Sequence, residues 1–82
     1  MTSKGWIWSE HIEFRMSKRK IPRELVETAI NDPDEIVSTE RDRLIYQKVA
    51  GNKLVRVVTE SNMLVTVYVT SKIKKYMGEK PL

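Results

Sequence analysis

The stretch "LVRVVTESNMLVTVYVT", residues 54–70, decides the fold, because it contains two apolar segments separated by a short polar turn. Valine alternates with other residue types on both sides of "ESN" at 60–62, and this period of two is typical of β-strands. A three-residue loop at 60–62 with Asn62 in the left-handed conformation fixes which residues face each other. The predicted cross-strand partners are Val57 with Val65, Val55 with Val67, and Arg56 with Thr66.

The same alternation extends back to Ile36 and predicts a four-stranded antiparallel sheet. Polar turns at 40–42, 50–52 and 60–62 separate the segments. The predicted strands are 36–39, 44–49, 54–59 and 63–70. With a three-residue turn at 50–52, the predicted partners are Ile45 with Val57, Tyr46 with Arg56, and Lys48 with Leu54.

These pairings predict one apolar and one polar face of the sheet. The apolar face contains Ile45, Val49, Val55, Val57, Val65, Val67 and Val69. The polar face contains Tyr46, Lys48, Arg56, Thr66, Tyr68 and Thr70. Aromatic and basic residues that alternate on an exposed sheet are typical of RNA-binding surfaces, since rings stack on bases and cations meet phosphates. Ordinary cross-strand pairing explains the same residues, because tyrosine and threonine favour strands.

Two helices precede the strands. Ser9 is a suitable N-cap for a first helix with Ile12 and Met16 on one face. Pro22 fits the first position of a second helix, which ends before Pro33. We therefore predict an α+β fold with two N-terminal helices packed on the four-stranded sheet. The predicted domain organisation is a single domain over 1–82, with an N-terminal extension at 1–8 and a basic C-terminal tail at 72–82.

The composition excludes several classes of site. The 82 residues contain no cysteine and one histidine, so disulfides, thiol catalysis and cysteine metal sites are excluded, and we expect no metal and no other cofactor. No segment has the length and hydrophobicity of a signal peptide or a membrane span, and we expect a cytoplasmic protein. Residues 43–82 contain eight Lys or Arg against two acids. This basic half favours a polyanionic partner, although a solvated basic surface has the same composition.

The segment "SEHIEFRMSKRK", residues 9–20, carries the candidate catalytic histidine. Metal-free RNA cleavage needs acid–base groups and a cation that stabilises the phosphate. Histidine is the side-chain type whose unperturbed pKa suits acid–base work near neutrality, which makes His11 a candidate, and Arg15, one helical turn later, can clamp a phosphate. The alternatives are a structural histidine, an Arg15 salt bridge and a solvated turn at 18–20. The complete set of candidates comprises His11, Arg15, Arg56 and Tyr68 for catalysis, and Tyr46, Lys48, Lys72, Lys74 and Lys75 for nucleic-acid binding.

The sequence resembles the domain-of-unknown-function family DUF4258 over about residues 9–71. The resemblance rests on a His-x-x-x-Arg-Met helix, a basic turn, a helix that ends on Asn-x-Pro and strands that end in Thr-x-Tyr. The matching residues are His11, Arg15, Met16, Ile21, Asn31, Pro33, Tyr46, Val57, Thr66 and Tyr68. The family arrangement looks like that of RelE-type and BrnT toxins of toxin–antitoxin systems, which cleave RNA without a metal. This likeness implies, by fold analogy, the same class of activity.

The leading functional prediction is therefore a RelE-like toxin homologue that acts on RNA, as a metal-independent mRNA endoribonuclease. Its expected partners are ribosome-associated mRNA, a cognate antitoxin and a second copy of the chain, with no membrane partner. One alternative is a non-catalytic nucleic-acid-binding module. Another is a small protein-interaction domain that uses Trp6 and Trp8 as anchors.

Overall fold

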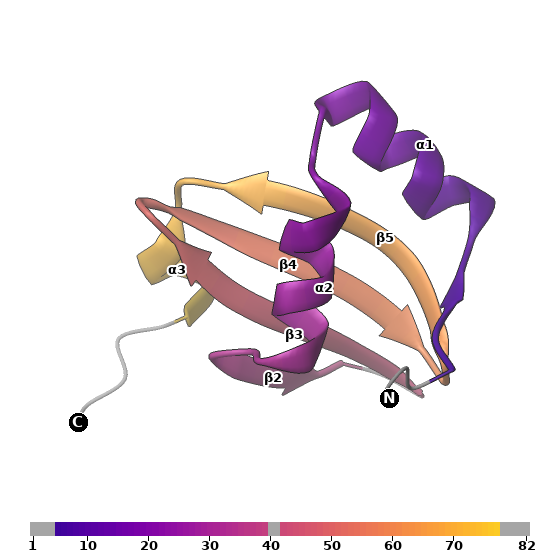
Figure 1. Cartoon of the computed structure of the whole chain (residues 1–82). Helices are drawn as coiled ribbons and strands as arrows, with labels where there is room; N and C mark the ends of the chain where they lie inside the picture. The colour runs from indigo at the N-terminus through magenta and orange to yellow at the C-terminus, as the bar shows by residue number, and fades with distance from the viewer. Residues whose placement is uncertain (1–4, 40–41, 78–82) are drawn as a thin grey trace.

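A computed structural model describes residues 5–39 and 42–77 of the chain (Figure 1). Its helices and strands form a single α+β unit. Along the chain they are β1 (Ile7–Trp8), α1 (Glu10–Arg19), α2 (Arg23–Asn31), β2 (Glu35–Ser38), β3 (Arg43–Ala50), β4 (Lys53–Glu60), β5 (Met63–Thr70) and α3 (Ile73–Met77). The four strands predicted from the sequence correspond to β2, β3, β4 and β5, and their bounds are confirmed to within about one residue at each end.

The sheet has five strands, in the order β1-β5-β4-β3-β2. The strands β2 to β5 are antiparallel, whereas β1 runs parallel to β5, with Ile7 opposite Met63. The four predicted strands are present and antiparallel, but the sheet contains a fifth strand that was not predicted and is therefore mixed. Residues 7 and 8 were predicted to belong to an extension, but their backbone completes the sheet edge. A two-residue strand has too little periodicity to be recognised from sequence.

Local sequence signals explain where α1 begins and ends. The Ser9 Oγ accepts a hydrogen bond from the Ile12 N–H at 3.1 Å, which caps the first turn as predicted. The helix ends at Lys20, which adopts the left-handed conformation (φ 57°) and donates its N–H to Met16 and Ser17 carbonyls.

The second helix begins one residue later than predicted. Pro22 is the N-cap of α2 and makes no side-chain capping bond, so Arg23 is the first helical residue. Asp32, immediately before Pro33, closes the helix at the predicted end.

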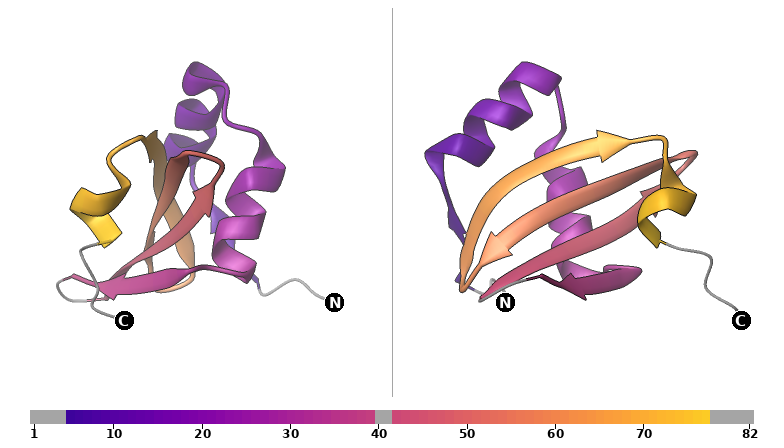
Figure 2. Two further views of the ribbon diagram at one scale, coloured as in Figure 1. Left: turned by 90° about the vertical axis from the view of Figure 1, so that its left-hand side faces the viewer. Right: turned by 180° about the vertical axis from the view of Figure 1, so that it is seen from behind.

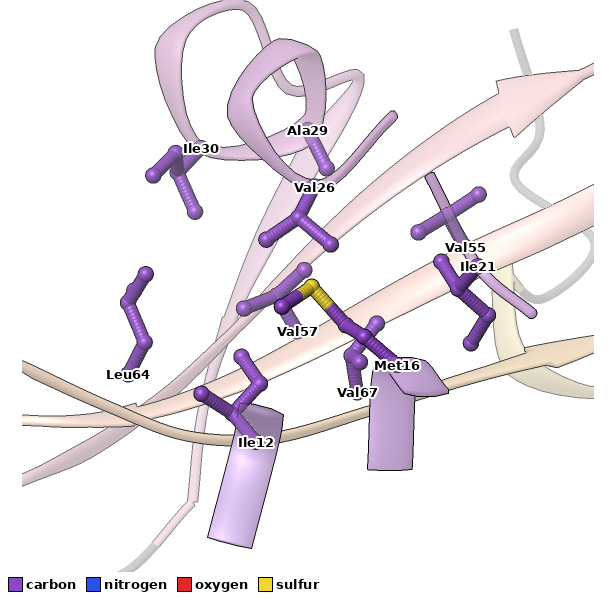
Figure 3. Close-up of a cluster of buried hydrophobic side chains, with 10 residues drawn as sticks. All are labelled: Ile12, Met16, Ile21, Val26, Ala29, Ile30, Val55, Val57, Leu64 and Val67. Atoms are coloured by element: carbon purple, nitrogen blue, oxygen red, sulfur yellow. The ribbon is translucent and has the colours of Figure 1, made fainter. Parts of the chain in front are cut away.

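The two faces of the sheet are covered by different helices (Figure 2). Helices α1 and α2 lie over one face, and the short α3 lies over the other. The main core lies between α1, α2 and the sheet (Figure 3). It consists of Ile12, Met16, Ile21, Val26, Ala29, Ile30, Val55, Val57, Leu64 and Val67. The predicted packing of Val55, Val57 and Val67 under two helices is confirmed.

The pairing of β3 with β4 differs from the prediction by one residue. A two-residue loop, Gly51 and Asn52, joins the strands, so Tyr46 lies opposite Val57 and Lys48 opposite Val55. Gly51 has φ 67°, a conformation that glycine adopts at little cost in tight hairpins. Because side chains alternate between faces, this shift moves every β3 side chain to the face opposite to the predicted one.

The pairing of β4 with β5 was also predicted wrongly, although Val55, Val57, Val67 and Val69 lie on the predicted apolar face. The loop contains two residues, Ser61 and Asn62, and the left-handed residue is Ser61 (φ 57°). A bulge between Val58 and Thr59 then shifts the register, so Val57 faces Val67. For Val57 the shift from the predicted partner is two residues, which keeps Val57 and Val67 on the helix-covered face, whereas Leu64 rather than the predicted Val65 joins the main core.

Candidate nucleic-acid interface

Arg56 is the centre of a polar row that crosses the α3 side of the sheet. Its neighbours in β3 and β5 are Gln47 and Tyr68, each directly opposite in the register. The Arg56 Nε donates to the Gln47 Oε1 at 2.6 Å, and a terminal guanidinium nitrogen donates to the Tyr68 hydroxyl. Arg56 is only 8% exposed and Gln47 is fully buried. These hydrogen bonds compensate for the desolvation of the buried polar groups.

Helix α3 covers this row with an aromatic ring and a thioether. The Arg56 Cζ lies 4.0 Å from the centroid of the Tyr76 ring, within the range of a cation–π interaction. The Tyr68 and Tyr76 rings meet edge to face at 6.4 Å. The Gln47 Nε2 donates to the Met77 Sδ at 3.3 Å. The Arg56 guanidinium therefore contacts a neighbour on each adjacent strand and the ring of Tyr76 on α3. These contacts fix the position of its charge.

The hydrogen-bond chain continues to the edge of the sheet. The Gln47 Nε2 also donates to the Glu35 Oε1 at 3.3 Å, so the amide connects a carboxylate on β2 with the Arg56 guanidinium. The Tyr68 hydroxyl at the other end accepts from Arg56, which leaves its own proton as a donor. The row therefore places a buried cation next to a phenolic donor.

Three exposed lysines border the cluster. Lys72 precedes α3, and Lys74 and Lys75 lie within it. The Lys75 Nζ lies 5.4 Å from the Tyr76 centroid. Together with the Arg56 guanidinium, these lysines give the α3 side of the sheet a positive potential.

The structure separates Tyr46 and Lys48 from Arg56 and Tyr68. Tyr46 packs against the main core and meets the Trp6 ring edge to face at 5.8 Å. The Lys48 Nζ lies 3.4 Å from Asp32 and 3.6 Å from Asp34 carboxylate oxygens. The prediction that all four residues share one face was wrong because the β3–β4 loop is one residue shorter than expected.

His11 and Arg15 also lie on the other side of the sheet from Arg56. Both belong to α1, which covers the opposite face from α3 (Figure 2). His11 is exposed, and Arg15 is partly buried with a buried Nε that has no hydrogen-bond partner. The structure therefore brings Arg56 and Tyr68 into contact and keeps the His11–Arg15 pair apart from them. Their catalytic roles stay predictions.

The residues Gln47, Tyr76 and Met77 were not predicted as site residues. Gln47 is the residue that faces Arg56 when the hairpin loop at Gly51 has two residues. Comparing both loop lengths would have found it. Tyr76 reaches Arg56, and Met77 reaches Gln47, through the path of the chain after β5, for which the sequence contains no local signal.

The N-terminal tryptophans, predicted as interaction anchors in one alternative, are partly buried against the main core. The Arg23 Cζ lies 3.9 Å from the Trp8 ring centroid. Trp6 and Trp8 therefore contribute to the packing at the end of the sheet.

Residues 5–39 and 42–77 contain no group of three or more His, Asp or Glu placed to hold a metal ion. No helix within the same ranges is long and apolar enough to cross a membrane.

Comparison with known proteins gives one result. No curated protein and no solved structure matches the chain. A family model does match residues 8–69, which is most of the chain and includes α1 through most of β5. The matched family is described as a domain of unknown function. The chain therefore belongs to the DUF4258 family.

Proposed function

We propose that this protein binds single-stranded RNA through the α3 side of its sheet, as a RelE-like toxin homologue whose target is RNA. The observation that carries the proposal is the cluster of Arg56, Tyr68 and Tyr76 beside three exposed lysines. Lysine side chains attract phosphates, and partly exposed tyrosine rings provide stacking surfaces for bases. Arg56 holds both rings in place and adds a fixed positive charge.

RNA rather than duplex DNA is the better fit for this surface. The aromatic rings lie on a sheet and a five-residue helix, and neither presents a long helix to a major groove. A single strand exposes its bases to such rings, whereas a duplex does not.

The test is fluorescence anisotropy with a labelled single-stranded RNA at several salt concentrations. We expect Tyr76→Ala to weaken binding by about 1–3 kcal/mol for the lost stacked base. We expect Lys74→Ala to weaken binding and to lower the salt slope by about 0.7, because one phosphate contact is lost. Lys18→Ala is the matched control, because Lys18 is an exposed lysine on α1, on the other side of the sheet. Equal losses in the variant and the control, or no binding at low salt, would overturn the proposal.

Metal-independent RNA cleavage is a second candidate function, favoured by the Arg56–Tyr68 hydrogen bond. A guanidinium can stabilise charge on the phosphate, a phenol can donate a proton to the leaving oxygen, and solvent water would accept the proton of the attacking 2′-hydroxyl. Tyr68→Phe removes the hydroxyl and keeps the ring. If the pair is catalytic, cleavage in the presence of EDTA should fall by a factor of about 100 or more while RNA affinity is retained. If the wild-type protein binds RNA without cleaving it, the protein is a binding module only.

The expected antitoxin and self-association are part of the same proposal. Their support is the resemblance to toxins of toxin–antitoxin systems, which remains a fold analogy. Co-expression with the product of a neighbouring small acidic gene, followed by gel filtration, would test the first. Gel filtration of the protein alone would test the second.

A further inference from the structure

A pocket on the helix-covered side of the molecule combines an apolar floor with a basic rim. It has a volume of about 360 Å³, near the lower end of the range of ligand-binding pockets, about 300–1,000 Å³. Its lining residues are Arg19, Lys20, Ile21, Pro22, Leu25, Lys53 and Val69. They come from the end of α1 and the turn that follows it, the first turn of α2, the start of β4 and the end of β5. No acidic residue among those that the structure describes lines it.

The three cations at the rim have no acidic partner inside the described part of the chain. Arg19, Lys20 and Lys53 are exposed, and none takes part in an ion pair there. Arg19 complements the C-terminus of α1, where positive charge is favourable. That local role does not explain Lys53, which comes from a strand distant in sequence. Three cations from two separate elements therefore converge on one opening.

The N-terminus of α2 adds to this positive potential. Pro22 lines the pocket and is the N-cap, yet its side chain accepts no hydrogen bond from the helix. The first N–H groups of a helix carry partial positive charge and attract anions when no cap satisfies them. Glu24, in the first turn of α2, offsets part of this charge, so the three cations of the rim supply most of the positive potential at the pocket.

We propose that this pocket binds an acidic peptide segment of a partner protein, with one bulky apolar side chain on the pocket floor. Aspartate or glutamate residues on either side of that apolar anchor would meet Arg19, Lys20 and Lys53. Charge complementarity and the apolar floor of Ile21, Leu25 and Val69 support this occupant. A nucleic acid fits less well, because no aromatic side chain of residues 5–39 and 42–77 lines the pocket to stack a base.

This inference is independent of the proposed RNA-binding function. The pocket lies on the side of α1 and α2, whereas the Arg56 cluster lies under α3 (Figure 2). The two surfaces can therefore succeed or fail separately in experiments.

The test is selection of a random dodecapeptide phage library on the immobilised full-length protein, followed by affinity measurements with the selected peptides. We expect enriched sequences with Asp or Glu on either side of Leu, Ile, Met or Phe. Lys53→Glu and Arg19→Glu should each weaken their binding at least tenfold. Val69→Thr, which keeps the volume of the floor but adds a hydroxyl, should weaken it about threefold. Circular dichroism of each variant checks that it is folded, and Lys53→Gln provides a milder change at the same position.

Lys18→Glu is the matched control, because Lys18 is exposed in the same basic run and does not line the pocket. Its effect should stay below threefold. No enrichment, enrichment without acidic residues, or equal losses for Lys18→Glu and Lys53→Glu would overturn the proposal. Displacement of the peptide by oligouridylate would also overturn it, in favour of a phosphate-binding site. Unchanged RNA affinity in Lys53→Glu would show that the two surfaces act separately.

Discussion

The two faces of the sheet differ in chemistry even though the same strands form both. Val55 and Arg56 are consecutive in β4, yet Val55 belongs to the apolar core and Arg56 to a hydrogen-bonded polar row. The face under α1 and α2 is covered by two helices that bury apolar side chains. The face under α3 is covered by a five-residue helix with no fully buried residue. The first face packs the main apolar core. The second face leaves the rings of Tyr68 and Tyr76 partly exposed, beside exposed lysines.

The largest effect should come from the apolar face. Ile12→Ala removes a fully buried side chain of α1 and should lower the free energy of unfolding by about 2–5 kcal/mol, through lost burial and a cavity. Urea denaturation measures this change. Phe14→Ala is the control on the same helix, because Phe14 is 58% exposed and should cost less than about 1 kcal/mol. Similar losses for both would contradict the assignment of the core to this face.

A smaller effect is expected in the polar row. Arg56→Ala leaves the Gln47 Oε1 and the Tyr68 hydroxyl without their donor and should cost about 1–3 kcal/mol. A double-mutant cycle with Gln47→Ala should give a coupling free energy of about 0.5–3 kcal/mol, because the two side chains share a hydrogen bond. Strictly additive losses would show that the row does not act as a unit.

The contact between α3 and the sheet should be weaker again. Tyr76→Ala removes the ring over the Arg56 guanidinium and should cost about 1 kcal/mol, the range of a partly exposed cation–π contact. In NMR spectra, the guanidinium protons of Arg56 should lose the shielding from the ring face and move downfield. Unchanged resonances would show that α3 does not cover Arg56 in solution.

The smallest effect is expected for Lys48, which the observed register places on the helix-covered face instead of the predicted polar face. Lys48→Ala removes ion pairs with Asp32 and Asp34 at the molecular surface and should cost less than about 1 kcal/mol, a loss that decreases with salt. Because Lys48 and the Arg56 cluster lie on opposite faces, RNA affinity should be unchanged in Lys48→Ala and reduced in Lys74→Ala. A larger affinity loss in Lys48→Ala would place the RNA on the helix-covered side.

Half of the candidate site could be predicted from sequence. Arg56 and Tyr68 were identified because they alternate with core valines, and the structure joins them by a hydrogen bond. Tyr46 and Lys48 were assigned to the wrong face because alternation depends on loop length, and the loop after β3 has two residues. Gln47 took the predicted place of Tyr46 for the same reason. Tyr76 depends on a chain reversal after Thr70 that periodicity does not describe.

The sequence by itself determined the features that depend on neighbouring residues. Ser9, Pro22 and Pro33 bound the helices, and alternating valines define the strands, because capping and side-chain periodicity act over a few residues. The tertiary structure decided the features that join distant segments. The parallel β1 at Ile7, the bulge after Val58 and the docking of α3 on Arg56 depend on which register buries the most apolar surface and satisfies the buried polar groups. A shift of one residue in such a register leaves the local capping and periodicity unchanged, but it moves every side chain of the strand to the opposite face of the sheet.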